Sequence, residues 1–389
     1  MTLASQNSSP ILWGRVFSLA LVQGAITLAW VVYNLYLVEL LTGLGFPKTM
    51  AAGLLLLENL LAMVMEPLMG SFSDRLQHRL GTRFPLISLG VILAAGCFLI
   101  LPTTLIWGQA GLRWVLPLLL VAWALAMTVF RSPALSLLGR YALRSQLPQA
   151  ASILTLVGGL AGSLGPLANQ FILDLGPMAA FAIGSGVLLM ATAALWRVGP
   201  DATAVSADHS SFDIAWGNLA LVFATGAAIT LGFRMVITRF PMVLNQQVPE
   251  ANSAAIMGAV FLALAVTAIP SGTLATRLGN HRAMIGGLGI MTLLAALMGN
   301  VSSSFLALVL ALIFGAAFSL VANGTLPFAL SMVPPQRAGL GTGMYFSGGA
   351  LASSLFGSLN VSVGLSFVVG AIAFAVAGVC IGGARLAKQ

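Results

Sequence analysis

The chain has 389 residues, of which 59% are hydrophobic and only 7% are charged, and its mean hydropathy is +1.02. A soluble globular chain carries about 25% charged residues, so this composition excludes a soluble protein and indicates an integral membrane protein. The formal net charge of +8 would suit a nucleic-acid partner, but the positions of the basic residues indicate a membrane topology instead.

We predict an all-α membrane protein with twelve transmembrane helices. A span needs about 20 mainly apolar residues, and helices are expected because backbone polar groups must be satisfied within lipid. A polar segment at 199–213 divides the chain into an N-terminal half, 1–198, and a C-terminal half, 214–389, with six helices each. The expected spans are 12–40, 48–70, 84–103, 113–138, 149–173, 178–197, 215–240, 252–274, 283–300, 304–332, 338–360 and 363–384.

The Lys and Arg residues predict which loops face the cytoplasm, because cytoplasmic loops carry an excess of these residues. With a cytoplasmic N-terminus, 12 of the 17 fall in inside loops or tails, and only Lys48, Arg113 and Arg239 fall outside. The other two, Arg131 and Arg234, lie within spans. Both termini are therefore expected in the cytoplasm. The lipid bilayer accounts for the basic charge without nucleic acid, and we expect a multi-pass protein of the inner (cytoplasmic) cell membrane.

A short motif follows the second span of each half. Residues 70–76 (GSFSDRL) align with residues 272–278 (GTLATRL), and Arg83 and Arg282 then open the next span in the two copies. The same loop chemistry at the same place indicates two parallel repeats related by an axis along the membrane normal.

The motif resembles the signature inner loop of the major facilitator superfamily, which runs Gly, three residues, Asp-Arg, and then a Gly with basic residues. The resemblance covers essentially the whole chain and implies secondary transport by alternating access. It also implies a cytoplasmic latch, in which the acid pairs with basic residues or with the end of a neighbouring helix and releases them in another conformation. The alternative is a solvated turn whose charges only set topology. The latch residues are Gly70, Asp74, Arg75, Gly81, Arg83 and Arg277, and the second copy has Thr276 in place of the acid.

Within this superfamily, Glu66-Pro67 followed by Gly70 resembles the second helix of the glycoside–pentoside–hexuronide cation symporters. The Ser-Asp-Arg hairpin is also similar to that of the proton-coupled sucrose transporters. In the cation symporters, second-helix acids join a carboxylate on the fourth helix to bind Na⁺ or H⁺. This chain has Arg131 where that carboxylate is expected. The difference argues against a Na⁺ site and favours H⁺ as the coupling ion.

Glu66 and Arg131 are expected to form an ion pair. Glu66 lies eight residues from Asp74, about 12 Å along a helix, and Arg131 lies nine residues from Arg140, about 13.5 Å. The two charges therefore lie at similar depth on helices that neighbour each other in this fold. The pair could serve ion coupling, or it could be purely structural.

Glu58 lies about 12 Å further from the cytoplasm than Glu66, with no basic residue at its depth in the first half. An unpaired buried carboxyl suits a proton-coupling site. Alternatively, Glu58 is structural or contacts solute, and Asn59 either hydrogen-bonds a neutral Glu58 or makes a polar helix contact.

The first span carries Gln23, Thr27, Trp30 and Asn34 at spacings of four, three and four, which place them on one helical face. The first, fourth, seventh and tenth helices line the cavity in the resembled superfamily, so this stripe is a candidate solute-binding wall. An amide, a hydroxyl and an indole on one face suit a polar, ring-shaped solute. The alternative is that the aromatic residues are packing or interface residues.

Two residues of the C-terminal half complete the candidate site. Arg234, in the seventh span, would bind an anionic group or form an outer gate, unless it extends toward the outer headgroups. Asn323, in the tenth span, would supply a second cavity amide.

The sequence contains no nucleotide-binding Gly-Lys-Thr loop. His78, His209 and His281 have no metal-ligand spacing, and Cys97 and Cys380 lie in apolar runs as small hydrophobic residues. We therefore expect neither an enzyme nor a cofactor or metal site.

These observations predict a secondary active transporter for a small polar organic solute, such as a sugar or glycoside, coupled to H⁺ and functional as a monomer. Two alternatives stay open: a proton-coupled exporter of hydrophobic compounds, and a non-transporting assembly or sensor protein on the same fold.

Overall fold

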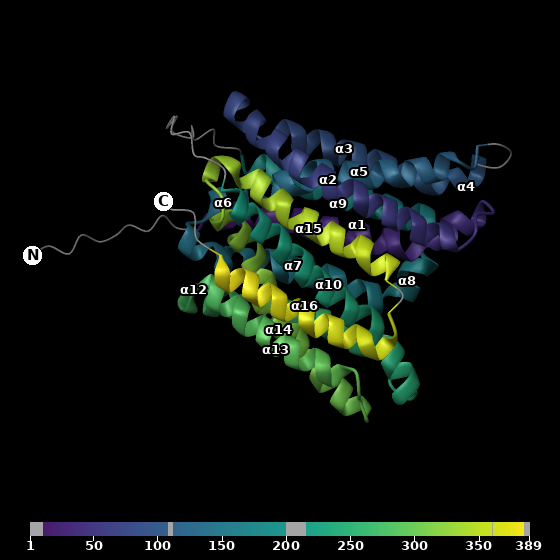
Figure 1. Ribbon diagram of the computed structural model, residues 1–389. Coiled ribbons are helices and arrows are strands. Elements are labelled where there is room, and N and C mark those ends of the chain that lie inside the picture. Colours follow the sequence, from purple (N-terminus) through teal and green to yellow (C-terminus); the bar gives the residue numbers. More distant parts are fainter. Residues whose placement is uncertain (1–10, 108–111, 200–214, 360, 385–389) are drawn as a thin grey trace, which may run out of the picture.

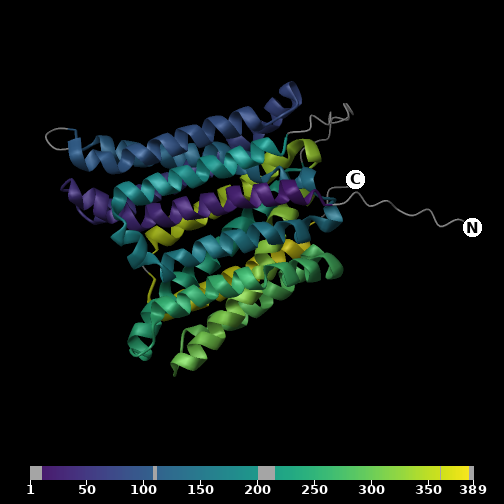
Figure 2. The ribbon, with the colours of Figure 1, turned by 180° about the vertical axis from the view of Figure 1, so that it is seen from behind.

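The computed structural model describes residues 11–107, 112–199, 215–359 and 361–384. Within these ranges, the regular structure consists of α-helices and short 3-10 turns and contains no strand. The long helices lie side by side in a single bundle (Figures 1 and 2). The all-helical class expected from composition is therefore confirmed, whereas the predicted linker at 199–213 falls almost wholly outside the described residues.

The helices of the N-terminal part are α1 (Trp13–Gly43), α2 (Thr49–Leu80), α3 (Phe84–Ile100), α4 (Thr104–Trp107), α5 (Val115–Leu135), α6 (Leu138–Tyr141), α7 (Leu147–Leu167), α8 (Asn169–Asp174) and α9 (Gly176–Arg197). Those of the C-terminal part are α10 (Trp216–Gln247), α11 (Ser253–Val266), α12 (Ala268–Leu278), α13 (Asn280–Met298), α14 (Ser304–Ser331), α15 (Ala338–Ser358) and α16 (Val363–Gly383). We call the end of the bundle where α1 begins and α2 ends the proximal end, and the opposite end the distal end (Figure 1).

Ten helical segments of the described chain are long and apolar enough to cross a membrane. The pair α11 and α12, bent by 49° at its break, forms an eleventh span if the two helices cross together. The predicted eleventh span corresponds to α15, a 21-residue helix rich in Gly and Ser that is not among these candidates. The membrane-spanning character is thus established. The count of twelve and the cytoplasmic termini stay predictions.

The second span is longer than the sequence indicated. We expected it to end at residue 70, with a loop up to Arg83, but α2 continues to Leu80. Gly70, Asp74 and Arg75 are therefore helical. The turn consists of residues 81–83 and begins at Gly81, whose φ of +74° is a left-handed conformation that glycine adopts readily. The charged residues do not end the helix, because residues 71–80 contain no Gly or Pro that would interrupt it.

Buried apolar side chains form two clusters. The first comes mainly from α1 to α9 and includes Trp123 and Phe181. The second comes from α10 to α16 and includes Phe314 and Phe374. Leu330, from α14, belongs to the first cluster, so the two helix groups are already in apolar contact near the proximal end.

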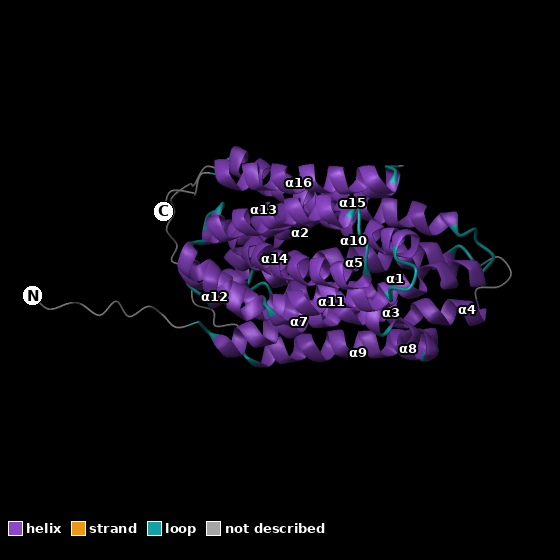
Figure 3. Cartoon of the chain, turned by 90° about the horizontal axis from the view of Figure 1, so that it is seen from below, coloured by secondary structure: helices purple, strands orange, loops and turns teal. Residues whose placement is uncertain are grey.

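The two helix groups meet along two seams. In one, α2 packs along α15, and in the other α7 packs along α11 and α12. Seen from below, in Figure 3, the helices of both groups run side by side through the bundle. A Cβ atom on Gly70 would overlap the backbone of Gly339, and one on Gly272 would lie 2.6 Å from the Cβ atom of Ser152. The repeated glycine of the two motif copies thus lets each seam close.

The replacement Gly70→Ala is expected to weaken the α2–α15 seam, because its methyl group would overlap the Gly339 backbone. Overpacking of this kind costs about 1–3 kcal/mol, so the midpoint of thermal unfolding of the purified chain should fall. Gly53→Ala is the matched control on the same helix, since a Cβ there meets nothing within 4 Å. An equal loss of stability in both variants would contradict the assignment.

Candidate functional site

A cavity of about 300 Å³ lies between the two helix groups, with walls from α1, α2, α5, α10 and α15. It lies distal to the point where the Ser347 hydroxyl on α15 donates a hydrogen bond to the carbonyl of Met63 on α2. Glu58, Arg131 and Arg234 line this space, which we call the distal cavity. Ionisable side chains within membrane helices are costly and mark functional sites, so the distal cavity is the candidate site.

The ion pair expected between Glu66 and Arg131 is present. Arg131 donates from Nε to Glu66 Oε1 at 2.8 Å and also from Nη2, while the Ser132 hydroxyl donates to Oε2. Glu66 is fully buried, and the guanidinium of Arg131 lies 4.5 Å from the ring centre of Phe346. Every charged atom of Glu66 therefore has a partner, and Arg131 extends the pair to the cavity wall.

Glu58 is hydrogen-bonded to Tyr33 and not to Asn59. Its Oε1 accepts a hydrogen bond from the Tyr33 hydroxyl, and its Oε2 has no hydrogen-bond partner in the described part of the chain. Asn59 donates to the carbonyl of Leu55 on its own helix, so of the two alternatives for Asn59 the structure has the polar helix contact and not the bond to Glu58. The ring of Tyr33 stacks on Trp123 at 4.4 Å between centres. One carboxyl oxygen of Glu58 is thus held against an aromatic wall, and the other is left unsatisfied in a residue that lines the cavity.

The stripe on α1 is divided between two cavities. Trp30 and Asn34 line the distal cavity, whereas Gln23 and Thr27 line a second cavity of about 270 Å³. This proximal cavity is enclosed mainly by α1, α7, α11, α14 and α15. Gln23 and Thr27 also bond to each other, with Gln23 Nε2 3.4 Å from Thr27 Oγ1. The four residues share one face as predicted, but they do not form a single wall.

Phe346 lines both the distal and the proximal cavity. It is the side chain between them, and Arg131 holds it through the ring contact described above. Phe346 is not among the residues predicted from the sequence. The available signal was a large aromatic side chain within the glycine-rich run 339–349, in a helix otherwise suited to close packing.

The two candidate residues from the C-terminal half lie in different surroundings. Arg234 is exposed to the distal cavity and has no hydrogen bond, ion pair or ring contact within the ranges that the structure describes. Asn323 is fully buried, and its Nδ2 donates to the carbonyl of Ala268 at 2.7 Å, at the break between α11 and α12. Asn323 therefore lines neither the distal nor the proximal cavity, contrary to expectation: its amide N–H bonds to the bent helix, and its Oδ1 is buried without a partner among the described residues.

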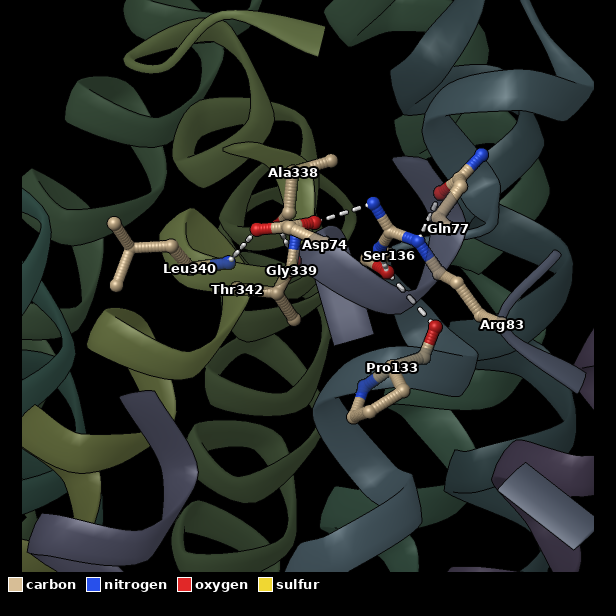
Figure 4. A network of polar contacts seen from close by, with 9 residues as sticks. All are labelled: Asp74, Gln77, Arg83, Pro133, Ser136, Ala338, Gly339, Leu340 and Thr342. Carbon is tan, nitrogen blue, oxygen red and sulfur yellow. Dashed lines mark hydrogen bonds and ion pairs between the residues drawn. The ribbon is translucent and has the colours of Figure 1, made fainter. Parts of the chain in front are cut away.

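At the proximal end, Asp74 contacts the N-terminus of α15 (Figure 4). Its Oδ1 accepts from the backbone N–H of Gly339 at 2.9 Å, and its Oδ2 accepts from that of Leu340 at 2.8 Å. Arg83 forms an ion pair with Asp74 and also donates to the side-chain oxygens of Gln77 and Ser136. A carboxylate at a helix N-terminus is favourable because the first N–H groups lack partners within the helix.

Arg83 is the buried centre of this network. Burial lowers the pKa of its guanidinium from its ordinary value, and the Asp74 carboxylate opposes that shift. Arg75 and Arg277 are exposed, and neither is among the contacts that Asp74 makes. The static part of the expected latch is therefore an Asp74–Arg83 pair that caps α15, and its release during a cycle stays a prediction.

The fold and the cavity define a multi-pass membrane protein with an internal polar site between two helix groups. The chain belongs to the Major Facilitator Superfamily, whose family model matches residues 19–358. Members of this family are transporters rather than enzymes. The finer resemblance to the glycoside and sucrose transporters stays a prediction.

Solved structures of two transporters share the fold. The human organic anion transporter MFSD10 (TETRAN) has a TM-score of 0.66 and 16% sequence identity, and the match covers 96% of this chain and 100% of that one. The Escherichia coli fucose:proton symporter FucP has a TM-score of 0.71 and 12% identity, covering 97% of this chain and 100% of that one. The sequence matches no curated protein.

A double-mutant cycle tests the buried pair. Glu66→Gln and Arg131→Gln should each lower stability by about 3–5 kcal/mol, because each leaves an uncompensated buried charge. The double variant should lose much less than the sum of the two, with a coupling energy of about 0.5–3 kcal/mol. Denaturant unfolding of the purified variants provides the measurement, and additive losses would show that the two charges do not interact.

Proposed function

We propose that this chain is a secondary transporter that moves a small polar organic solute by alternating access and couples that movement to H⁺. The observation that carries the proposal is the distal cavity, in which Glu58, Asn34 and Arg234 lie between two helix groups whose proximal contact is closed. Two transporters of the same fold are named for a sugar with a proton and for an organic anion, and a sugar and an anion are both polar.

Glu58 is the proposed proton-coupling group. Its Oε2 is buried without a hydrogen-bond partner among the described residues, in a residue that lines the cavity, and such a carboxyl favours the protonated form. A Na⁺ site is disfavoured because Arg131 occupies the neighbourhood of Glu66 with a positive charge. Charged and amide groups in the cavity also favour a polar solute over the alternative of a hydrophobic exported compound.

The proposed cycle uses the contacts already described. Solute and proton enter the distal cavity while Asp74 holds α15 at the proximal end. The α2–α15 seam then opens, Asp74 releases α15, and Phe346 no longer separates the two cavities. The solute leaves through the proximal side. Because one chain encloses both cavities, we propose that the monomer is the transport unit, with the Lys- and Arg-rich proximal end in the cytoplasm of the cell.

The coupling role predicts the behaviour of Glu58→Gln. The assay adds a panel of labelled sugars and organic acids to proteoliposomes and measures uptake. This variant should lose accumulation driven by a pH gradient, because a neutral amide cannot exchange a proton. It should keep the exchange of solute across the membrane. Glu39→Gln, an exposed acid on α1, should behave as the parent chain. If gradient-driven accumulation survives in Glu58→Gln, another group couples the proton.

The separation of the two cavities predicts a leak in Phe346→Ala. Removing the ring joins the cavities, so downhill solute flux should rise while the accumulation ratio at a fixed pH gradient falls. Phe356→Ala, on the same helix and outside both cavities, is the control. Unchanged flux and accumulation in Phe346→Ala would show that the ring is only a packing residue.

A further inference from the structure

We infer that the solute is a small organic monoanion whose carboxylate binds Arg234. This inference rests on the proposed function and specifies the chemical class of the cargo. It follows from the charges that line the distal cavity, from the depth of Arg234 in its helix, and from the side chains that surround it.

Among the described residues, the distal cavity is lined by one cation that has no ion-pair partner. Three ionisable residues line it: Glu58, Arg131 and Arg234. Arg131 is neutralised by Glu66, and Glu58 shares a hydrogen bond with Tyr33. Arg234 has no ion pair among the residues that the structure describes. Its guanidinium faces the distal cavity, where it can form an ion pair with an anionic solute.

The protonation state of Glu58 sets the net charge of the distal cavity, and therefore whether a bound anion makes it neutral. While Glu58 is ionised, its negative charge balances that of Arg234 within the same cavity. When Glu58 takes up a proton, the cavity holds one excess positive charge. A monoanionic solute then restores neutrality, so proton and anion are expected to enter together as an electroneutral pair. A neutral solute would leave the excess charge in the membrane.

Depth argues against Arg234 as a residue that extends toward the headgroups. Arg234 lies about 4 Å from the midpoint of α10, a helix of 32 residues. A hydrocarbon core about 30 Å thick would leave roughly 11 Å between this position and its nearer edge. Arg239, five residues further toward the distal end, instead lies 5.9 Å from the ring centre of Phe356. The cavity, rather than the interface, is the polar environment available to Arg234.

The surroundings of Arg234 suit a carboxylate on a compact body. A guanidinium binds a carboxylate through two parallel hydrogen bonds. Thr230 lies one turn earlier on the same face of α10, lines the same cavity and can donate a further hydrogen bond. Trp30 and Phe346 provide apolar walls for a ring or short chain, and Asn34 provides an amide for a hydroxyl.

The test compares matched acids and neutral analogues on the full-length purified chain. The probes are D-glucuronate against D-glucose, lactate against lactamide, and benzoate against benzamide. Thermal unfolding in detergent reports binding, because a ligand stabilises the state that it binds. We expect at least one acid to raise the unfolding midpoint and its neutral partner to leave it unchanged. If no acid stabilises the chain, or if neutral partners stabilise it as well as the acids do, the inference is overturned.

Three variants locate the binding group. Arg234→Gln should lower the affinity for the stabilising acid at least tenfold, and Arg234→Lys should recover part of it, because a lysine keeps the charge without the paired hydrogen bonds. Arg239→Gln, on the same helix, should bind as the parent chain does. The unfolding midpoint of each variant without ligand shows whether it folds. Parent-like affinity in folded Arg234→Gln would overturn the role of Arg234.

Uptake into proteoliposomes separates this inference from the proposed function. Uptake of the bound acid that is driven by a pH gradient and insensitive to membrane potential supports both. Gradient-driven uptake of glucose alone overturns the anion inference and leaves proton-coupled transport in place. Uptake of the acid that ignores the pH gradient supports anion recognition and overturns the proposed H⁺ coupling.

Discussion

The carboxylate of Asp74 closes the proximal end by completing a helix that belongs to the other helix group. The first N–H groups of α15 have no partners of their own, and Asp74 satisfies those of Gly339 and Leu340 while Arg83 neutralises its charge. When the α2–α15 seam opens, water can replace each of these bonds. A hydrogen bond to a charged group that is exchanged for water changes stability by about 1.5–3 kcal/mol. The closed contact is therefore specific in geometry, and the free energy that these hydrogen bonds contribute is small enough for the contact to be reversed.

The same seam determines where the polar residues of the membrane interior lie. Proximal to Met63, α2 is packed against α15, and distal to it the two helices border the cavity. Glu66 lies on the packed side and has all its partners, whereas Glu58, two turns further, faces the cavity with one oxygen unpaired. The same helix thus carries Glu66 in a structural ion pair and Glu58 as the candidate proton-coupling acid. They differ because α2 is packed against α15 at Glu66 and borders the cavity at Glu58.

Much of this arrangement followed from regular helix geometry. The rise per residue placed Glu66 and Arg131 at one depth, and the period of the helix placed Gln23 and Asn34 on one face. Contacts that depend on the relative position of separate helices could not be obtained in this way. Tyr33 as the partner of Glu58 and Phe346 as the partition both require the packed bundle. The composition likewise identified the all-helical class.

Two expectations failed for local reasons. The second span did not stop at its charged residues, because a helix continues until its backbone conformation changes, and the first such change is at Gly81. The amide N–H of Asn323 donates a hydrogen bond to the carbonyl of Ala268, at the bend between α11 and α12. The bend itself is not visible in hydropathy, so the sequence offered no reason to assign that amide to packing.

The unequal motif copies have a consequence for how the bundle moves. Both seams contain a close-packed glycine, but only α2 carries an acid, since Thr276 stands at the matching position and bonds to its own helix at Gly272. One seam is therefore fastened by charge and the other by contact alone. In the proposed cycle, we therefore expect the α2–α15 seam to open and the two helix groups to turn about the α7–α12 seam.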